Sequence, residues 1–178
     1  DKLIQKATLL TPNLIEAKEI LQLKGKSVEI NTVDDFTGIA KEVSVITGAK
    51  HVLLKGGHIT WLTESSKLND LGNAQDGSFI TDVLDESTTD TVKLFKSEFI
   101  KTGNTHGSGC TLAATISANL AKGYTVEEST SMALRYVHAA IVSSSNITLS
   151  EISKNGPLNH FYNIPSSTVH TSGFTEGH

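Results

Sequence analysis

A short uninterrupted apolar run, Val52-Leu53-Leu54, ends at Lys55-Gly56-Gly57 and limits the folds open to this chain. A strand with one solvated face alternates apolar and polar residues, whereas a strand covered on both faces is apolar throughout. The run therefore predicts a strand buried on both faces of a sheet. Such an arrangement is typical of α/β folds.

Helix-forming patterns precede this run. Asn13 is a good N-cap and opens a helix that ends at Gly25. An apolar period of 3.6 residues between positions 32 and 48 predicts a second helix. Before them, Ala7–Leu10 is expected to form a short strand, joined to Val52–Leu54 by the helices as in a parallel crossover.

The second half of the chain predicts a strand pair and two more helices. Residues 79–84 and 91–95 are strand-like and separated by Asp, Ser and Thr, which predicts a hairpin near a sheet edge. Helices are expected over 111–121 and from Thr125 onward. Residues 63–77 are polar and are expected to form a surface loop. The order of elements indicates an α/β fold whose further strands are missing on the N-terminal side.

Composition excludes several classes of function. The 19 acidic and 15 basic residues give a net charge of -4, so no nucleic acid partner is expected. No apolar run approaches the ~18 residues of a membrane span, and no membrane partner is expected. Cys110 is the single cysteine and fits a reducing compartment, so a cytoplasmic location is expected. The first residue, Asp1, is not Met, and the chain is expected to begin inside a longer protein.

A glycine-rich loop, Gly107-Ser108-Gly109, leads into the Ala-rich helix. A helix N-terminus carries unpaired N–H groups and about half a positive charge, and glycines let a phosphate approach the backbone. The loop is therefore a candidate site for a transferring phosphoryl group, with a plain glycine-rich turn as the alternative. Cys110 follows in the first helical turn, where the helix field favours a thiolate that could accept a proton. The alternative is a buried, inert cysteine.

Two further candidates follow predicted strand ends, where open α/β sheets bind ligands. Lys55 could reach a phosphate as a point charge, or it could be a solvated lysine at a strand end. Asn13 and Glu16 could hold magnesium through water, although this spacing is also that of a helix-capping box. The histidines lack the spacing of a zinc site, and the sequence has no Walker motif.

Three segments that contain Asn13, Lys55 and Cys110, in this order along the chain, resemble hydroxymethylpyrimidine phosphate kinases of thiamin biosynthesis. These kinases are ribokinase-like enzymes. The third is the most specific, because most ribokinase-like enzymes have an aspartate where this chain has Cys110. The resemblance runs from about Thr8 to Tyr162, and its ending is similar to fungal members. The segments are Thr11-Pro12-Asn13 with Glu16-Ala17, Val52-Leu53-Leu54-Lys55-Gly56-Gly57-His58, and Asn104-Thr105-His106-Gly107-Ser108-Gly109-Cys110-Thr111-Leu112.

The resemblance implies a ribokinase-like three-layer α/β/α sandwich. Residues 1–165 would be the C-terminal nucleotide-binding part of a kinase domain, and residues 166–178 a tail or linker. The implied reaction is ATP-dependent phosphorylation of hydroxymethylpyrimidine or its monophosphate, with magnesium. Pyridoxal kinase activity and a non-catalytic nucleotide-binding fragment are the alternatives. A homo-oligomer and a downstream thiaminase-II-like domain, as in some fungal members, are compatible with the resemblance.

The family's site residues map onto positions of this chain. The nucleotide would lie near the loop before Thr105 and the last two helices, with Thr105 itself among the residues expected to bind ATP or its phosphates. Bacterial members carry a second phosphate-contacting lysine where this chain has Leu134, so the neighbouring Arg135 is a candidate substitute. Ser108 stands where threonine is usual and keeps the hydroxyl. The matches are Cys110 as catalytic base, Gly107, Ser108 and Gly109 as anion hole, Lys55 as phosphate contact, and Asn13 and Glu16 near magnesium and its water.

Overall fold

The computed structural model describes residues 4–57, 59–61, 69–70, 77–145 and 156–164. The predicted tail at 166–178 and most of the predicted loop at 63–77 lie outside these residues. The elements are η1 (Ile4–Lys6), α1 (Leu14–Gln22), α2 (Val33–Thr47), β1 (His51–Leu54), β2 (Ile59–Thr60), β3 (Asn69–Asp70), β4 (Phe79–Glu86), β5 (Thr91–Glu98), α3 (Ser108–Ala121) and α4 (Val126–Ser144).

The central sheet has the order β1-β4-β5, and each neighbouring pair is antiparallel. Strands β4 and β5 form the predicted hairpin, with β5 at the end of this order. On the other side of β1, Leu10 pairs with Val52 and Asn13 pairs with Lys55, both in parallel. The expected parallel crossover is therefore confirmed in its direction.

The segment before α1 makes isolated bridges instead of the short strand expected at Ala7–Leu10. The Leu10 amide donates to His51 O at 3.0 Å, and Leu10 O accepts the Leu53 amide at 2.8 Å. Pro12 comes next and has no N–H group to continue this ladder. The proline therefore explains why the pairing does not extend into a regular strand.

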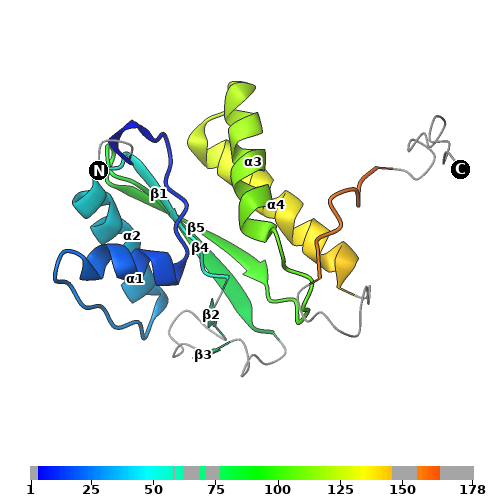
Figure 1. Ribbon diagram of the computed structural model, residues 1–178, viewed down its shortest axis with the longest axis horizontal. Helices are drawn as coiled ribbons and strands as arrows, with labels where there is room; N and C mark the ends of the chain where they lie inside the picture. Colours follow the sequence, from blue (N-terminus) through cyan, green and yellow to red (C-terminus); the bar gives the residue numbers. More distant parts are fainter. Residues whose placement is uncertain (1–3, 58, 62–68, 71–76, 146–155, 165–178) are drawn as a thin grey trace, which may run out of the picture.

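Side-chain alternation along the sheet builds two hydrophobic clusters. Val52, Leu54 and Val83 pack with α1 and α2 on one face. Leu53 and Leu84 pack with α3 and α4 on the opposite face. Figure 1 shows the two helical pairs on opposite sides of the sheet, so the three-layer α/β/α architecture is confirmed.

Capping residues set the starts of three helices. Asn13 before α1, Thr32 before α2 and Thr125 before α4 each form a capping box. Helix α3 differs, because its N-cap is Gly107 in the left-handed region (φ 85°) and no side chain caps it. It begins at Ser108, ahead of the predicted start at residue 111, since serine and glycine have low helix propensity and concealed this turn.

A small antiparallel ribbon of β2 and β3 adjoins the start of β4, where Trp61 pairs with Phe79. The sequence placed residues 69–70 in a loop, because a two-residue strand carries no detectable period. Among the described residues, no helix combines the length and apolarity needed to cross a membrane.

Candidate functional site

The candidate site forms where β1 ends. The segment before α1 runs parallel to β1, so both end at the same edge of the sheet, and the Lys55 amide donates to Pro12 O at 2.9 Å. Alternation along the strand places Lys55 on the same face as Leu53, toward α3 and α4. Lys55 is half-buried there, at the end of a strand, where open α/β sheets bind ligands.

Lys55 reaches the first turn of α3. A methyl group added at Gly109 would lie 3.5 Å from Lys55 Nζ. The amides of Gly109 and Cys110 have no hydrogen-bond acceptor among the described residues. The ammonium group and the uncapped helix end therefore present donors to the same place, which suits a multi-oxygen anion.

Cys110 is exposed in the first turn of α3. The alternative of a buried, inert cysteine is therefore wrong. The helix directs Leu112 and Ile116 into the core instead, which leaves Cys110 facing solvent. A thiol in this position is accessible to a substrate hydroxyl.

The loop before α3 is organised by local turns. Thr105 is exposed, its amide donates to Gly103 O at 3.1 Å, and its carbonyl accepts the Ser108 amide at 3.2 Å. Gly107 then adopts φ 85°, a conformation that glycine takes without steric cost. The loop therefore leads directly into the first turn of α3, where Gly109 lies beside Lys55.

A downstream segment closes the same loop, a role that the sequence did not indicate. The Gly156 amide donates to Gly103 O at 3.0 Å, and Gly156 O accepts the His106 amide at 3.1 Å. A Cβ at Gly156 would lie 1.8 Å from Asn104 Oδ1, so a side chain there would displace Asn104. The sequence signal for this segment is the similarity of its residues 156–162 to the ending of fungal members.

The same segment also contacts α3 and α4. His160 Nε2 and Thr111 Oγ1 are 2.9 Å apart, and the Tyr136 hydroxyl donates to His160 O at 2.6 Å. The Asn104 side chain donates to Ser144 O at 2.5 Å. The loop is therefore fixed against the last helix by side chains as well as by backbone bonds.

Asn13 and Glu16 form the capping box that was the alternative to a magnesium role. Glu16 Oε2 accepts the Asn13 amide at 2.7 Å, and Asn13 Oδ1 accepts the Glu16 amide at 2.9 Å. Within the described parts of the chain, no group of three or more His, Cys, Asp or Glu residues is arranged so that it could hold a metal ion. Because Glu16 is exposed and one of its carboxylate oxygens is free of these bonds, the pair fits a magnesium ion held mainly by phosphate and water.

Asp82 is a buried residue of the site that the sequence did not reveal. The β1–β4 register, continued by one residue, places it opposite Lys55, and its Oδ1 accepts the Gly56 amide at 2.9 Å. Burial raises the pKa of Asp82 to about 6, although the Gly56 hydrogen bond and the charge of Lys55 oppose the rise. The sequence showed Asp82 only as one residue of a predicted hairpin strand.

The last long helix does not bring Leu134 to this site. Leu134 packs against the cluster that contains Leu53 and Leu84. Arg135 is exposed and makes no hydrogen bond or ion pair with the residues that the structure describes. Its role as a substitute for the second lysine stays a prediction.

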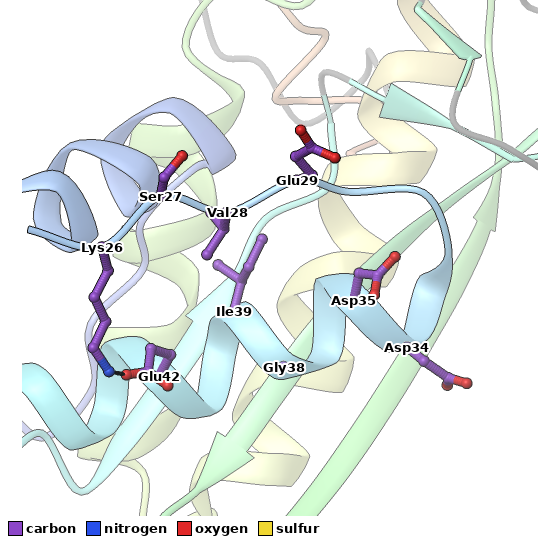
Figure 2. A pocket seen from close by; sticks show the side chains of 9 residues that line it. All are labelled: Lys26, Ser27, Val28, Glu29, Asp34, Asp35, Gly38, Ile39 and Glu42. Atoms are coloured by element: carbon purple, nitrogen blue, oxygen red, sulfur yellow. Dashed lines mark hydrogen bonds and ion pairs between the residues drawn. The ribbon is translucent and has the colours of Figure 1, made fainter.

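A separate open groove of about 520 Å³ lies on the α2 side of the molecule (Figure 2). Its lining includes Lys26 and Glu42, which form an ion pair across it, and the apolar side chains of Val28 and Ile39. None of the predicted site residues lines it. The groove is therefore distinct from the site at the end of β1.

Comparisons with known proteins identify similar sequences. A family model described as phosphomethylpyrimidine kinase matches residues 1–159. A hydroxymethylpyrimidine/phosphomethylpyrimidine kinase of Saccharomyces cerevisiae is 37% identical over 164 residues, which cover 92% of this chain and 27% of the yeast protein. Pyridoxine kinase of Bacillus subtilis is 36% identical over 144 residues, which cover 81% of this chain and 45% of that protein.

The fold matches solved structures as well. An ADP complex of Bacillus subtilis pyridoxal kinase superposes with a TM-score of 0.67 at 33% identity. The match covers 91% of this chain and 53% of the solved chain. The chain thus spans about half of that structure and a smaller share of the curated relatives named above.

Proposed function

Because this chain belongs to the phosphomethylpyrimidine kinase family, we propose that it forms the nucleotide-binding part of a small-molecule kinase. The proposed reaction transfers a phosphoryl group from ATP to hydroxymethylpyrimidine or its monophosphate in thiamin biosynthesis. The names of the curated relatives support this choice of substrate. The observation that carries the proposal is the position of Lys55 Nζ beside Gly109, at the one α-helix of the described four that lacks a side-chain cap.

The geometry suggests a role for each group. The transferring phosphoryl group would lie against the amides of the first turn of α3, with Lys55 as a point charge beside it. The substrate hydroxyl oxygen attacks phosphorus as the bond to the ADP leaving group breaks. The hydroxyl proton passes to the Cys110 thiolate, which is exposed at the same turn.

Magnesium belongs to the proposal through Asn13 and Glu16. The ion, when bound, would neutralise charge on the nucleotide phosphates. The capping box leaves Glu16 exposed beside the end of β1, because Asn13 pairs with Lys55. Glu16 would therefore contact the ion's water and not the ion itself.

ATP consumption with hydroxymethylpyrimidine and magnesium tests the proposal, with Cys110→Ala as the informative variant. Loss of a general base is expected to lower kcat by roughly 10²–10⁴-fold with little change in nucleotide affinity. Ser117→Ala, at an exposed position on α3, is the matched control and should keep wild-type turnover. Equal losses of turnover and affinity in Cys110→Ala would remove its role as base.

The result for the wild-type chain separates the alternatives. Turnover supports a catalytic chain. Nucleotide binding without turnover supports a non-catalytic nucleotide-binding fragment. Neither turnover nor binding of ATP with magnesium would reject the proposed function of this chain.

Pyridoxal kinase activity is the second candidate, because relatives of that class match the same residues. The observations that favour it are the Bacillus subtilis pyridoxine kinase and the pyridoxal kinase structure with a TM-score of 0.67. A comparison of kcat/KM on pyridoxal and on hydroxymethylpyrimidine decides between the two. A higher kcat/KM on pyridoxal than on hydroxymethylpyrimidine would identify pyridoxal as the preferred substrate.

Three further features are part of the proposal. The free thiol of Cys110 suits a cytoplasmic location. The proposal is compatible with a homo-oligomer, which size-exclusion chromatography checks. It is also compatible with a thiaminase-II-like domain downstream in the longer protein, which sequencing of the full reading frame checks.

A further inference from the structure

We propose that Asp82 is a positioning residue that holds Lys55 in place beside the first turn of α3, an inference that rests on the proposed function above. Asp82 lies on β4, and its side chain points to the face covered by α3 and α4, the same face as Leu84. The strand register places it opposite Lys55. The two residues therefore form a cross-strand pair of opposite charge at the end of β1.

The backbone around Lys55 is fixed by contact with β4. A Cβ at Gly56 would lie 2.0 Å from Thr81 O, so β1 and β4 approach closely immediately after Lys55. The Gly56 amide then donates to Asp82 Oδ1 at 2.9 Å. Asp82 thus anchors the peptide that follows Lys55, which sets the direction from which the Lys55 side chain leaves the sheet.

The Asp82 carboxylate also interacts electrostatically with the Lys55 ammonium group, although the two groups form no ion pair. No ion pair within 4.0 Å joins the two side chains among the described interactions. Lys55 Nζ lies beside Gly109 instead. The Lys55 ammonium group therefore remains available to an anion at the start of α3. The charge of Asp82, on the neighbouring strand, attracts the same ammonium group electrostatically.

Asp82 is an expensive residue for the fold to bury, which argues for a role beyond packing. It is 8% exposed, and its burial opposes the charged form. Asp85, on the same strand, faces α2 and receives a close hydrogen bond from Ser44. Asp85 therefore offers a matched control, because it is buried and acidic but points away from Lys55.

The first test compares binding of ADP with magnesium, by calorimetry, to the wild-type chain and three variants. Asp82→Leu removes both the acceptor and the charge and should weaken binding roughly tenfold. Asp82→Asn keeps an acceptor for the Gly56 amide and should weaken it roughly threefold. Asp85→Asn should bind as the wild type does.

A double-mutant cycle with Lys55→Met shows whether Asp82 acts through Lys55. In the Lys55→Met background, Asp82→Leu should cause little further loss of affinity. An Asp82→Leu loss of the same size in both backgrounds would overturn the proposal, because the effect would then bypass Lys55. Emission of the fully buried Trp61 confirms that each variant is folded.

The second test does not depend on nucleotide and separates this inference from the proposed function. Competitive acetylation followed by mass spectrometry measures the reactivity of each lysine. Asp82→Leu should raise the acetylation rate of Lys55 several-fold and leave the acetylation rate of the exposed Lys50 unchanged. Asp85→Asn should change neither rate. An unchanged rate at Lys55 would reject the positioning role, even if the chain binds nucleotide; failure of the wild-type chain to bind nucleotide would reject only the proposed function.

Discussion

Two buried aspartates on β4 lie on opposite faces of the sheet, and the fold treats them differently. Asp85 faces the α1–α2 side, where Ser44 donates a close hydrogen bond to it inside an aliphatic layer. Asp82 faces the α3–α4 side, accepts the Gly56 amide, and has a pKa raised by burial to about 6. Asp85 is thus bound by a side-chain hydroxyl from α2, whereas Asp82 is bound by a backbone amide beside the candidate anion site.

The helix ends show the same contrast. On the α1–α2 side, both helices begin with a capping box that occupies their amides with side-chain oxygens. On the α3–α4 side, α4 is capped in the same way, but α3 begins at Gly107 without a side-chain cap. A capping side chain at α3 would compete with a phosphate for the same donors.

Gly56→Ala should have the largest effect on stability. Gly56 lies where β1 and β4 approach closely, and both faces of the sheet depend on that approach. Its Cβ would lie 2.0 Å from Thr81 O and 3.0 Å from Thr81 C, both backbone atoms that cannot turn away. We expect a loss of about 3 kcal/mol or more in the free energy of unfolding, measured by urea denaturation. Gly57→Ala has nothing within 4 Å of the new Cβ and should cost less than about 1 kcal/mol. Equal stabilities for the two variants would show that β1 and β4 do not approach this closely.

The second prediction concerns the pH dependence of stability in Asp82→Asn. Raising a carboxyl pKa from 3.8 to about 6 on folding corresponds to about 3 kcal/mol. The folded state binds the extra proton, so this stabilisation is present below pH 3.8 and is lost as pH rises through about 6. Between about pH 4 and pH 7, the wild type should therefore lose about 3 kcal/mol relative to Asp82→Asn.

Urea denaturation of both proteins across this pH range measures the difference. Carboxyl groups such as Asp35, whose pKa is lowered by hydrogen bonds from Asn31 and Thr32, titrate in both proteins and cancel. A constant stability difference from pH 4 to pH 7 would mean that Asp82 is not held in a charge-disfavouring environment. The contrast between the two faces would then disappear.

Ser44→Ala should affect the opposite face alone. Removing the hydroxyl leaves the Asp85 carboxylate buried without its partner, which is expected to cost about 1–3 kcal/mol of stability. Binding of ADP with magnesium should stay within about twofold of the wild type. A large loss of nucleotide affinity, with the fold intact, would show that the two faces are coupled.

Lys26→Met should have the smallest effect and sets the scale for surface charge. Lys26 and Glu42 form an ion pair across the open groove in Figure 2, and both side chains are partly exposed. Such pairs contribute about 0–1 kcal/mol, so the melting temperature should change little. A loss of stability as large as that of Ser44→Ala would show that this ion pair contributes more than an ordinary surface pair.

Local patterns in the sequence were enough to predict much of the fold. The capping residues Asn13 and Thr125 and the turn between β4 and β5 act within a few positions, and the structure confirms them. The apolar run at Val52–Leu54 predicted the strand that both clusters share. The prediction of a regular strand at Ala7–Leu10 was wrong, because Leu10 alone of these residues forms a bridge to β1 and Pro12 cannot donate the next bond of the ladder.

The candidate site was predictable only where its residues stand in recognisable motifs. Lys55, Gly109 and Cys110 could be named from strand ends and the glycine-rich loop, and the structure brings Lys55 to Gly109. Asp82 and Gly156 could not, because their roles depend on contacts with residues far away in the sequence. Neither a strand period nor a turn pattern specifies which distant residue a side chain will meet.

The hydrogen bonds between Gly156 and the glycine-rich loop affect the order in which parts of the chain can fold during synthesis. The ribosome releases Gly103–Gly107 well before Gly156, which supplies two backbone hydrogen bonds to that loop. Domains fold as synthesis proceeds from the N-terminus, so the sheet and α3 can assemble while this last partner is still inside the exit tunnel. A nascent chain could therefore form the sheet and α3 before Gly156 completes the hydrogen bonds that fix the glycine-rich loop.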